Sequence, residues 1–330
     1  MKRLLSRRTA LAAATILPVA NLLPRSAAAD GPWKPSQGIR IIVPAAPGGT
    51  TDIVARLLAA FLQQAWGQSC VVDNKSGAGG VIGSNEVVKA NPDGTTALMG
   101  NIGPQSIAYS LYRNMPYGPK SLAPVSCVIT APNVLVVHPS VPAKTVPEFV
   151  AWLKAQNGKV SYASSGTGQS PHLSAAWFLQ LTGTKAEHIP YRGAAPALQD
   201  VIGGRIPVTF STLSGAIGLV RDGKLRPLAV AGPNRSEVLP GVPTLAELGL
   251  EIPDTSPWYG FVGPARMPQA IVRRIASDVQ GLLLRPELAK RIVDQGGAVE
   301  GEGPEEFAAR MRREVAENAE VAKIAGIKVE

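Results

Sequence analysis

The chain has 330 residues, which is too long for one ordinary domain and short for three. Hydrophobic residues make up 45% of it and charged residues 17%, a balance that supports a sizeable core and excludes wholesale disorder. Five of the nine net positive charges come from Lys2, Arg3, Arg7, Arg8 and Arg25, so the rest of the chain carries only +4. Since no cluster of Lys and Arg with interleaved aromatic residues remains, binding of nucleic acid is not expected.

Residues 1–29 have the pattern of an export signal. The basic start MKRLLSRR leads into an apolar stretch, and small residues at Ala27 and Ala29 predict cleavage after Ala29. The motif SRRTAL also fits a twin-arginine signal, so the general secretion route and the twin-arginine route both stay open. No later segment has about 18 uninterrupted apolar residues, so we expect no membrane-spanning segment in the mature chain.

Apolar runs alternate with amphipathic patterns along the rest of the chain. Strands are expected at 39–43, 69–73, 95–99, 122–129, 133–138, 160–163, 187–190, 206–210, 227–231 and 258–262. Helices are expected at 51–65, 80–90, 146–156, 170–182, 194–203, 215–222, 268–284, 286–294 and 304–323. This alternation predicts an α/β fold whose mainly parallel sheets are flanked by helices.

Two proline-containing segments, TAPNVLVVHPSVP (130–142) and LEIPDTSPW (250–258), have the composition of hinges or crossovers. They predict one lobe made of residues 30–133 and 254–330, a second lobe made of residues 134–253, and a ligand cleft between the two. Cys70 and Cys127 lie in apolar, strand-like runs. They either form a disulfide, as an oxidising compartment permits, or stay apart as small buried residues.

Four glycine-rich loops each join a predicted strand to a predicted helix: APGGTTD (46–52), NKSGAGGVIGSNE (74–86), SSGTGQSPHLS (164–174) and YRGAAPALQD (191–200). Helix N-termini present unpaired N–H groups and a partial positive charge, and glycine lets a ligand approach the backbone closely. Each loop alone also fits ordinary turn and cap chemistry. Together, at the carboxyl ends of strands, they predict an anionic ligand held by backbone amides with help from Ser and Thr hydroxyls.

Enzyme signatures are missing from the sequence. The glycines of GAGGVIG do not have the dinucleotide-binding spacing, and neither a phosphate-binding loop nor a G-x-S-x-G motif occurs. Of the three histidines, His138 and His188 are expected in structural positions, whereas His172 either reaches the cleft or serves in capping and packing. No pair has metal-ligand spacing, so neither a metal nor a cofactor is expected, and no group of residues forms a catalytic constellation.

Several long motifs, among them VPAAPGGTTDIVARLLA, VVDNKSGAGGVIGSNEVVKANPDGTTALMG, YASSGTGQSPHLSAAWFLQLTG and PYRGAAPALQDVIGGRI, stand in the order found in one family. The chain resembles the substrate-binding proteins of tripartite tricarboxylate transporters, also called the Bug family of periplasmic solute receptors. The resemblance implies a type II periplasmic binding-protein fold whose two lobes close on a small carboxylate. It also implies a periplasmic, monomeric receptor that serves a permease of one large and one small membrane subunit. A sensory subunit on the same fold, and an enzyme that uses His172 and a cleft serine on a small acid, are the alternatives.

The resemblance also assigns ligand-binding residues. It implies a carboxylate clamp from two loops and side walls from two others, namely Pro47, Gly48, Gly49 and Thr50, Ser165, Gly166, Thr167 and Gly168, Gly77, Ala78, Gly79 and Gly80, and Tyr191, Arg192 and Gly193. The chain departs from the family pattern at Ala45, where an aromatic residue is common, at Ser211, where Asp is common, and at Ser76. If Ala45 and Ser211 face the cleft, they favour a larger mono- or dicarboxylate without an amino group.

The export signal gives a first test. Because small residues follow the apolar run at the expected distance, the protein recovered from the periplasm should begin at Asp30. Intact-mass measurement of the secreted protein checks this start. Recovery of the full-length chain in the membrane fraction would show that residues 1–29 anchor the protein instead.

Overall fold

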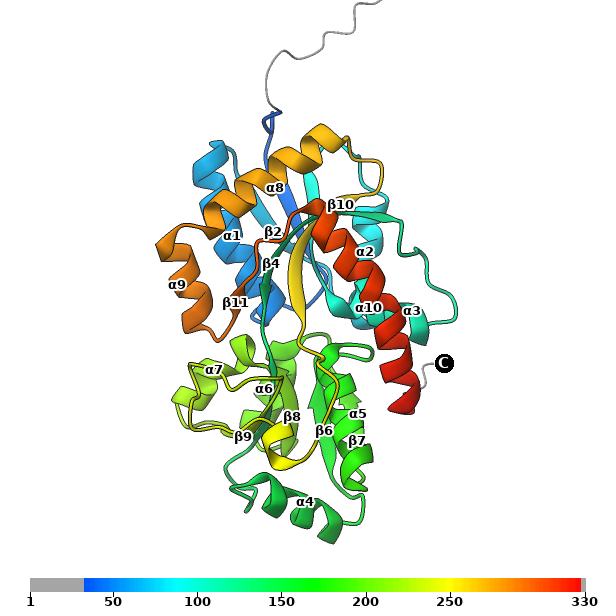
Figure 1. Ribbon diagram of the computed structural model, residues 1–330, viewed down its shortest axis with the longest axis vertical. Helices are drawn as coiled ribbons and strands as arrows, with labels where there is room; N and C mark the ends of the chain where they lie inside the picture. Colours follow the sequence, from blue (N-terminus) through cyan, green and yellow to red (C-terminus); the bar gives the residue numbers. More distant parts are fainter. Residues whose placement is uncertain (1–32, 328–330) are drawn as a thin grey trace, which may run out of the picture. The chain divides into compact units, whose positions relative to one another are not determined.

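The described part of the chain forms two β-sheets, and each sheet is flanked by its own helices (Figure 1). The structure is a computed structural model, and it describes residues 33–327. The expected signal segment and its cleavage site after Ala29 lie outside these residues. Within them, no helix is both long enough and apolar enough to cross a membrane.

The first sheet, in the described part of the chain, has the strand order β11-β4-β10-β3-β1-β2. Its strands are β1 (Ile39–Val43), β2 (Cys70–Asn74), β3 (Thr96–Asn101), β4 (Leu122–Thr130), β10 (Trp258–Pro264) and β11 (Ala298–Val299). Strands β2 and β3 run parallel to β1, whereas β10 is antiparallel to both β3 and β4. With the helices that cover it, this sheet forms lobe 1.

Both faces of the first sheet are covered by helices. The side chains of Ile41 and Val43 face α1, α8 and α9, and those of Ile42 and Leu98 face α2, α3 and α10, because successive residues of a strand point to opposite faces. The helices are α1 (Thr50–Trp66), α2 (Val81–Val88), α3 (Ala108–Leu111), α8 (Gln269–Leu283), α9 (Pro286–Asp294) and α10 (Pro304–Ile324), with a short 3-10 helix η1 (Ala78–Gly80) and a short π-helix η2 (Gly103–Ile107).

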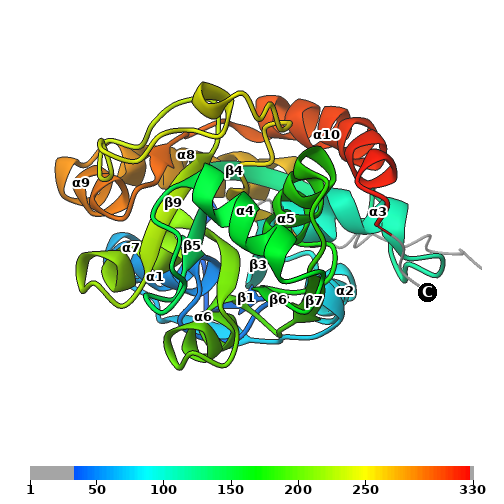
Figure 2. The same ribbon diagram turned by 90° about the horizontal axis from the view of Figure 1, so that it is seen from below.

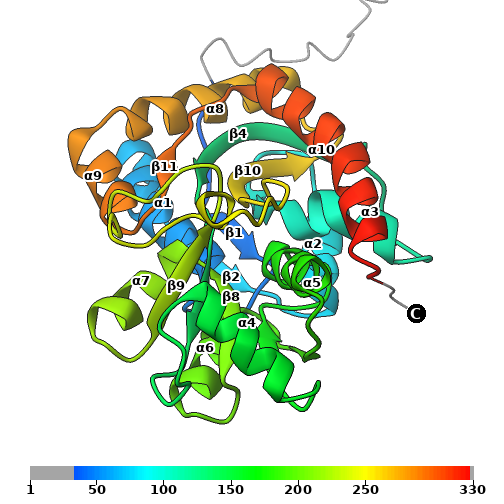
Figure 3. The same ribbon diagram turned by 60° about the horizontal axis from the view of Figure 1, so that its bottom comes forward.

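The second sheet has the order β7-β6-β8-β5-β9 and forms lobe 2 with the helices around it. Its strands are β5 (Asn133–Val137), β6 (Ser161–Ser164), β7 (Glu187–Pro190), β8 (Val208–Thr212) and β9 (Arg226–Ala231). The helices are α4 (Val146–Ala155), α5 (Ser170–Thr182), α6 (Ala194–Ile202) and α7 (Leu213–Arg221), with the short turn η3 (Ala246–Leu248). Helices α4 and α5 pack on one face of the sheet and α6 and α7 on the other (Figures 2 and 3).

The predicted α/β class is confirmed, but each sheet is mixed rather than mainly parallel. Most of the antiparallel pairings involve β5 and β10. These are the first strands that the chain forms after it passes from one lobe to the other. The exact lobe boundaries, 30–133 with 254–330 and 134–253, stay predictions. Cys70 and Cys127 are free, and strands β1, β3 and β10 separate the strands that carry them.

Strand β10 and helix α10 are joined by a buried aromatic contact and by a half-buried acid, Glu314. Trp258 is fully buried, and its ring meets Phe307 edge to face at a centroid distance of 4.9 Å. The indole Nε1 of Trp258 donates a hydrogen bond of 2.6 Å to Glu314 Oε2. Burial raises the pKa of Glu314 to about 7, although the bond from Trp258 acts in the opposite direction. The folded protein therefore holds a proton on Glu314 that the unfolded chain releases near pH 4.5.

This acid makes stability depend on pH. Because the folded pKa lies above the unfolded one, Glu314 stabilises the fold below pH 4.5 and loses that contribution as the pH rises to about 7. Glu314→Gln, which keeps an acceptor for Trp258, should remove this loss and be more stable than the native protein at pH 8 by on the order of 1–3 kcal/mol. Chemical unfolding at pH 5 and pH 8 measures the difference. Glu317→Gln on the same helix is the control, and an equal effect of the two substitutions would refute the assignment.

Candidate functional site

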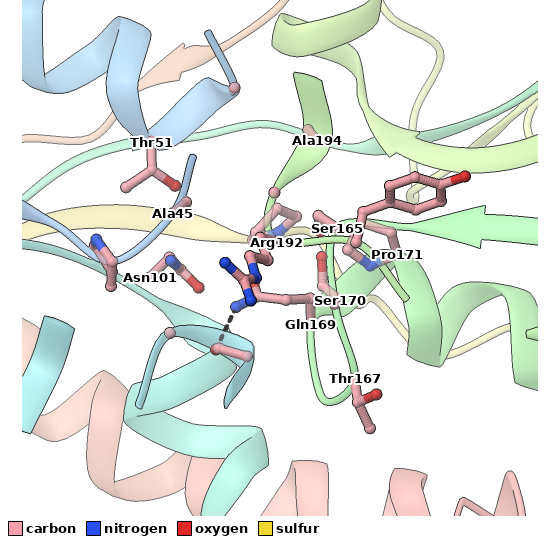
Figure 4. A pocket seen from close by; sticks show the side chains of 18 of the residues that line it. Ala45, Thr51, Asn101, Ser165, Thr167, Gln169, Ser170, Pro171, Arg192 and Ala194 are labelled. Carbon is pink, nitrogen blue, oxygen red and sulfur yellow. Dashed lines mark hydrogen bonds between the residues drawn. The ribbon is translucent and has the colours of Figure 1, made fainter. Parts of the chain in front are cut away.

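A cavity of about 230 Å³ lies between the two lobes, where the four glycine-rich loops meet. In Figure 4, Ala45, Thr51 and Asn101 come from lobe 1, and Ser165 and Ser170 come from lobe 2. The lining consists of the loops before α1, α2, α5 and α6 and of strand ends beneath them: Pro44, Ala45, Gly49, Thr50, Thr51, Gly77, Ala78, Gly79, Gly80, Asn101, Tyr112, Ser165, Gly166, Thr167, Gln169, Ser170, Pro171, Pro190, Tyr191, Arg192, Gly193, Ala194, Thr212, Pro257 and Tyr259.

Helix α1 begins at the cavity with no side-chain cap. Its N-cap residue is Gly49, which has no side chain to accept hydrogen bonds from the first turn. The N–H groups at the start of a helix have no partner inside the helix, so those of Thr50 and Thr51 need one from outside. The hydroxyl of Thr50 is also buried without a hydrogen-bond partner in residues 33–327. The start of α1 is therefore a cluster of unsatisfied polar groups beside the cavity.

The loop before α2 approaches lobe 2 so closely that only glycine fits. Gly79 has φ of +58°, and a Cβ placed on it would lie 2.4 Å from the carbonyl oxygen of Thr167. The carbonyl oxygen of Gly79 accepts a hydrogen bond of 2.7 Å from Gln169 Nε2, drawn as the dashed line in Figure 4. Gln169 is the N-cap residue of α5 and leaves the first turn of that helix without a side-chain cap. This wall of the cavity is thus a direct lobe-to-lobe contact.

The loop before α6 forms the opposite wall. Its N-cap residue Gly193 has no side chain to cap the helix. The N–H of Ala46 in lobe 1 donates a 2.9 Å hydrogen bond to the carbonyl oxygen of Arg192 in lobe 2. The side chain of Arg192 is exposed and is the one charged group in the lining, which contains no acidic residue. The uncapped ends of α1, α5 and α6 and the cation of Arg192 give the cavity a positive potential suited to an anion.

Three polar residues at strand ends form the base of the cavity, and the sequence did not identify them. Asn101 ends β3, and its Oδ1 accepts a 3.0 Å bond from the N–H of Gly103. Thr212 ends β8, and its hydroxyl lies 3.0 Å from that of Tyr259 on β10. Asn101, Thr212 and Tyr259 are all buried and supply neutral hydrogen-bonding groups. Their only signal in the sequence is a polar residue within an apolar strand, which does not by itself predict a site.

Most of the predicted ligand-binding residues line the cavity. Those it brings together are Ala45, Gly49, Thr50, Gly77, Ala78, Gly79, Gly80, Ser165, Gly166, Thr167, Tyr191, Arg192 and Gly193. The others, Pro47, Gly48, Gly168, His172 and Ser211, do not line it. Local contacts explain why these residues do not line the cavity. Pro47 has no N–H to offer, and the N–H of Gly48 is already donated to Asp52 Oδ2 at 2.9 Å.

His172 and Gly168 serve lobe 2 internally. The N–H of Gly168 donates to His172 Nδ1 at 3.3 Å, and the rings of His172 and His188 stack with centroids 3.8 Å apart. Burial, together with the neighbouring His188, lowers the pKa of His172 to about 3. His172 is therefore a neutral packing residue, the second of the two roles expected for it, and it does not line the cavity. Ser211 also points away, because the next residue, Thr212, faces the cavity and adjacent side chains of a strand alternate.

The described residues contain no group of three or more His, Cys, Asp or Glu side chains arranged to hold a metal ion. The cavity also brings together no nucleophile with a base. Its chemistry is that of a binding site: backbone N–H donors, hydroxyls, the side-chain amides of Asn101 and Gln169, and one guanidinium from Arg192.

Comparison with known proteins agrees with this geometry. Residues 54–320 match the model of the tripartite tricarboxylate transporter family receptor, a family of receptors and not of enzymes. The chain is 35% identical to Protein BugT of Bordetella pertussis over 79% of this chain and 81% of that protein. The structure of the periplasmic binding protein BugD superposes with a TM-score of 0.86 at 31% identity, covering 90% of this chain and all of that one.

The structure of R. palustris Rpa4515 with adipate superposes with a TM-score of 0.87 at 33% identity, covering 89% of this chain and 99% of that chain. These likenesses confirm the two-lobed periplasmic binding-protein fold, the family resemblance carried by the glycine-rich motifs, and the expectation that the chain is not an enzyme. The chain belongs to the tripartite tricarboxylate transporter receptor family.

Proposed function

We propose that the protein is a periplasmic receptor that binds a small carboxylate between its two lobes and delivers it to a tripartite tricarboxylate-type membrane transporter. The observation that carries the proposal is the cavity itself, where helix N-termini without side-chain caps surround a space with no acidic lining residue. A carboxylate satisfies such N–H groups through charge-assisted hydrogen bonds, which are stronger than bonds between neutral groups.

The size of the cavity restricts the ligand. Sites for drug-sized ligands usually have volumes of about 300–1,000 Å³. The cavity here has about 230 Å³ and is bounded by the lobe-to-lobe hydrogen bonds of Ala46 and Gln169. It therefore suits a small organic acid of the size of a short dicarboxylate. The adipate bound in the R. palustris relative is an acid of this class.

The lining also disfavours amino acids as ligands. The ammonium group of an amino acid needs a carboxylate partner, and no Asp or Glu side chain lines the cavity. Ala45 lines the cavity, and its small side chain leaves room for the ligand. Ser211 does not line it, so the identity of that residue lends no support to this preference. A mono- or dicarboxylate without an amino group is the expected ligand.

The proposed setting follows from the family. A receptor exported by the signal in residues 1–29 would work in the periplasm, and BugD is described as a periplasmic binding protein. A monomer fits the proposed function because one chain supplies both walls of the cavity. The proposed partners are the large and small membrane subunits of the permease, which receive the ligand when the lobes separate.

A thermal-shift screen tests the function. We expect one or more of adipate, malate, citrate and benzoate to raise the melting temperature, since a ligand at about 100 times its Kd adds roughly 2.7 kcal/mol to the free energy of unfolding. Aspartate and glutamate should have smaller effects, for want of an ammonium partner in the cavity. The diamide of the best dicarboxylate is the matched uncharged control. If no acid shifts the melting temperature, or the diamide acts as well as the acid, carboxylate recognition is refuted.

A substitution at Gly49 tests the clamp. The φ and ψ of Gly49, −88° and 173°, are open to any residue, and a Cβ there would lie 3.4 Å from the Cβ of Ala194 across the cavity. Gly49→Val should therefore fold, yet its side chain should displace the carboxylate from the N–H groups of Thr50 and Thr51. Loss of one charge-assisted hydrogen bond costs about 1.5–3 kcal/mol, so affinity measured by calorimetry should fall at least about tenfold.

The control for this variant is Gly218→Val. Gly218 lies in α7 and does not line the cavity, and a Cβ placed on it would have open space around it to 4 Å. We expect native affinity from Gly218→Val and a comparable melting temperature for both variants. Native affinity in Gly49→Val would place the anion away from the start of α1.

A further inference from the structure

An acidic residue sits in the first turn of the helix whose start faces the cavity. Asp52 is the third residue of α1 and is 3% exposed, yet it does not line the cavity. A carboxylate at this place would repel an anionic ligand if it faced the same way as the N–H groups of Thr50 and Thr51. Its orientation therefore needs an explanation from its own contacts.

Asp52 is held on the far side of the helix start by hydrogen bonds from three residues. Its Oδ2 accepts the N–H of Gly48 at 2.9 Å, and its Oδ1 accepts Asn74 Nδ2 at 3.0 Å. Arg56 Nε lies 3.1 Å from Oδ1 and 3.0 Å from Oδ2. Burial would raise the pKa of Asp52, but the bonds from Arg56, Gly48 and Asn74 together lower it below its ordinary value. The group is an ion at neutral pH, and the cation of Arg56 balances its charge.

The same contacts fix the loop that precedes α1. Asn74 Nδ2 also donates to the carbonyl oxygen of Ala45 at 3.0 Å, and Arg56 Nη2 donates to Asn74 Oδ1 at 3.1 Å. Asp52 thus holds the end of the loop at Gly48, while Asn74 holds its start at Ala45. Both anchoring side chains belong to lobe 1, so the loop is shaped within one lobe.

Residues 46–48 of this loop have no backbone donor left to use. The N–H of Ala46 is donated to Arg192 O, Pro47 has none, and that of Gly48 is donated to Asp52. Next along the chain come the N–H groups of Gly49 and of the first turn of α1. Beside the helix start, a ligand therefore meets these N–H donors and none from residues 46–48.

Helix α4 gives a comparison within the same chain. Its Glu148 occupies the position that Asp52 occupies in α1, and Glu148 Oε2 accepts the N–H of Lys144 just before the cap at 2.7 Å. Asp52 makes the corresponding bond to Gly48. In α4 the hydroxyl of Thr145 also accepts the N–H of Glu148 at 3.3 Å, which makes a reciprocal pair similar to a capping box, with the acid bonded one residue earlier. In α1 the cap residue is Gly49, so that second half is missing.

From these contacts we infer that Asp52 and Asn74, with Arg56, are positioning residues that hold the loop of residues 45–48 so that the start of α1 stays free for the ligand carboxylate. The inference rests on the proposed carboxylate-binding function. It extends the binding site to three residues that do not line the cavity. The side chains act through Ala45 and Gly48, which they hold at the two ends of the loop.

The positioning role and a plain charge effect predict opposite changes in ligand affinity when Asp52 is replaced by Asn. If Asp52 acted only through its charge, its replacement by the isosteric Asn would remove a negative group near the site and tighten binding of an anion. If it positions the loop, Asp52→Asn should weaken binding. Asp73→Asn is the matched control, because Asp73 on β2 also carries one negative charge in lobe 1 but pairs with Arg40 and Lys75 and not with the loop.

The first measurement needs no ligand. Hydrogen exchange at the Gly48 amide, followed by NMR, should become about tenfold faster in Asp52→Asn, since a charge-assisted hydrogen bond is lost there, while the melting temperature stays near that of Asp73→Asn. Asn74→Ala, which keeps the pair of Asp52 and Arg56, should give a similar loosening and replaces Asp52→Asn if that variant does not fold. Native exchange at Gly48 in both variants would overturn the inference.

The second measurement uses adipate and calorimetry. Asp52→Asn and Asn74→Ala should each raise the Kd about tenfold or more, and the double variant should resemble the single ones because both act through one loop. Asp73→Asn should stay within about twofold of native. Tighter binding by Asp52→Asn would overturn the inference in favour of the charge effect. If native protein binds no adipate, the proposed function fails for that acid, and exchange at Gly48 still decides the positioning role.

Discussion

The structure depends on one electrostatic constraint: backbone N–H groups at the starts of several helices meet at a cavity and have no partners from their own helices. Such groups are costly to bury unless something accepts their hydrogen bonds. Helices α1 and α6 both start with a glycine cap, Gly49 and Gly193, and α5 starts with Gln169, whose side chain is used elsewhere. No acidic group lines the space between them. An anion or ordered water must therefore complete the site, and an anion gains most from the helix dipoles.

The closed arrangement of the lobes follows from how this site is divided. Neither lobe alone provides all the donors, so a ligand that contacts α1 and α5 together favours the state in which the two lobes meet. The bonds from Ala46 to Arg192 and from Gln169 to Gly79 stabilise the same state from the rim of the cavity. The hydroxyls of Thr212 and Tyr259, 3.0 Å apart, add a buried contact between the lobes at its base.

Beneath the cavity, a buried polar network joins the crossover strands to the site. Asn133 Nδ2 bonds the hydroxyls of Ser170 and Ser174 at 2.9 and 3.0 Å, and the hydroxyl of Ser174 lies 2.7 Å from that of Thr255. Asn133 begins β5 and Thr255 precedes β10, so both chain passages between the lobes take part. Since Ser170 also lines the cavity, this network links the cavity to both chain segments that connect the lobes.

Much of this arrangement was predictable because the chain's periodicity is strong. The expected strand at 39–43 and helix at 170–182 coincide with β1 and α5. The turn η2 and helix α3 were missed, since GPQSIAYSL has no clear helical period. At the site, sequence identified residues that neighbour one another in loops but missed Asn101 and Tyr259. Those two meet only because β10 returns from late in the chain to pair with β3, a long-range pairing that local pattern does not encode.

For two of the predicted site residues, Ser211 and His172, the structure differs from the prediction in side-chain direction. Ser211 and Thr212 are adjacent on β8, and only Thr212 faces the cavity, because a shift of one position on a strand exchanges its faces. On α5, Ser170 and Pro171 line the cavity, while His172 lies about 100° further around the helix and packs on His188. A motif match locates a loop to within a residue or two. To assign a side chain to the ligand, one must also know on which face of its strand or helix that side chain lies.

The comparison of α1 with α4 explains why the first loop is so bare. A complete capping box satisfies two sets of backbone donors, and replacing a capping hydroxyl costs about 1 kcal/mol. At α4, Thr145 accepts the N–H of Glu148, and Glu148 accepts the N–H of the residue before the cap. At α1, Asp52 supplies the half that shapes the loop, and Gly49 leaves the other half open. A ligand carboxylate bound there would accept hydrogen bonds from the first turn of α1, as the hydroxyl of Thr145 does for α4. The stabilisation of the helix start would then contribute to the free energy of binding.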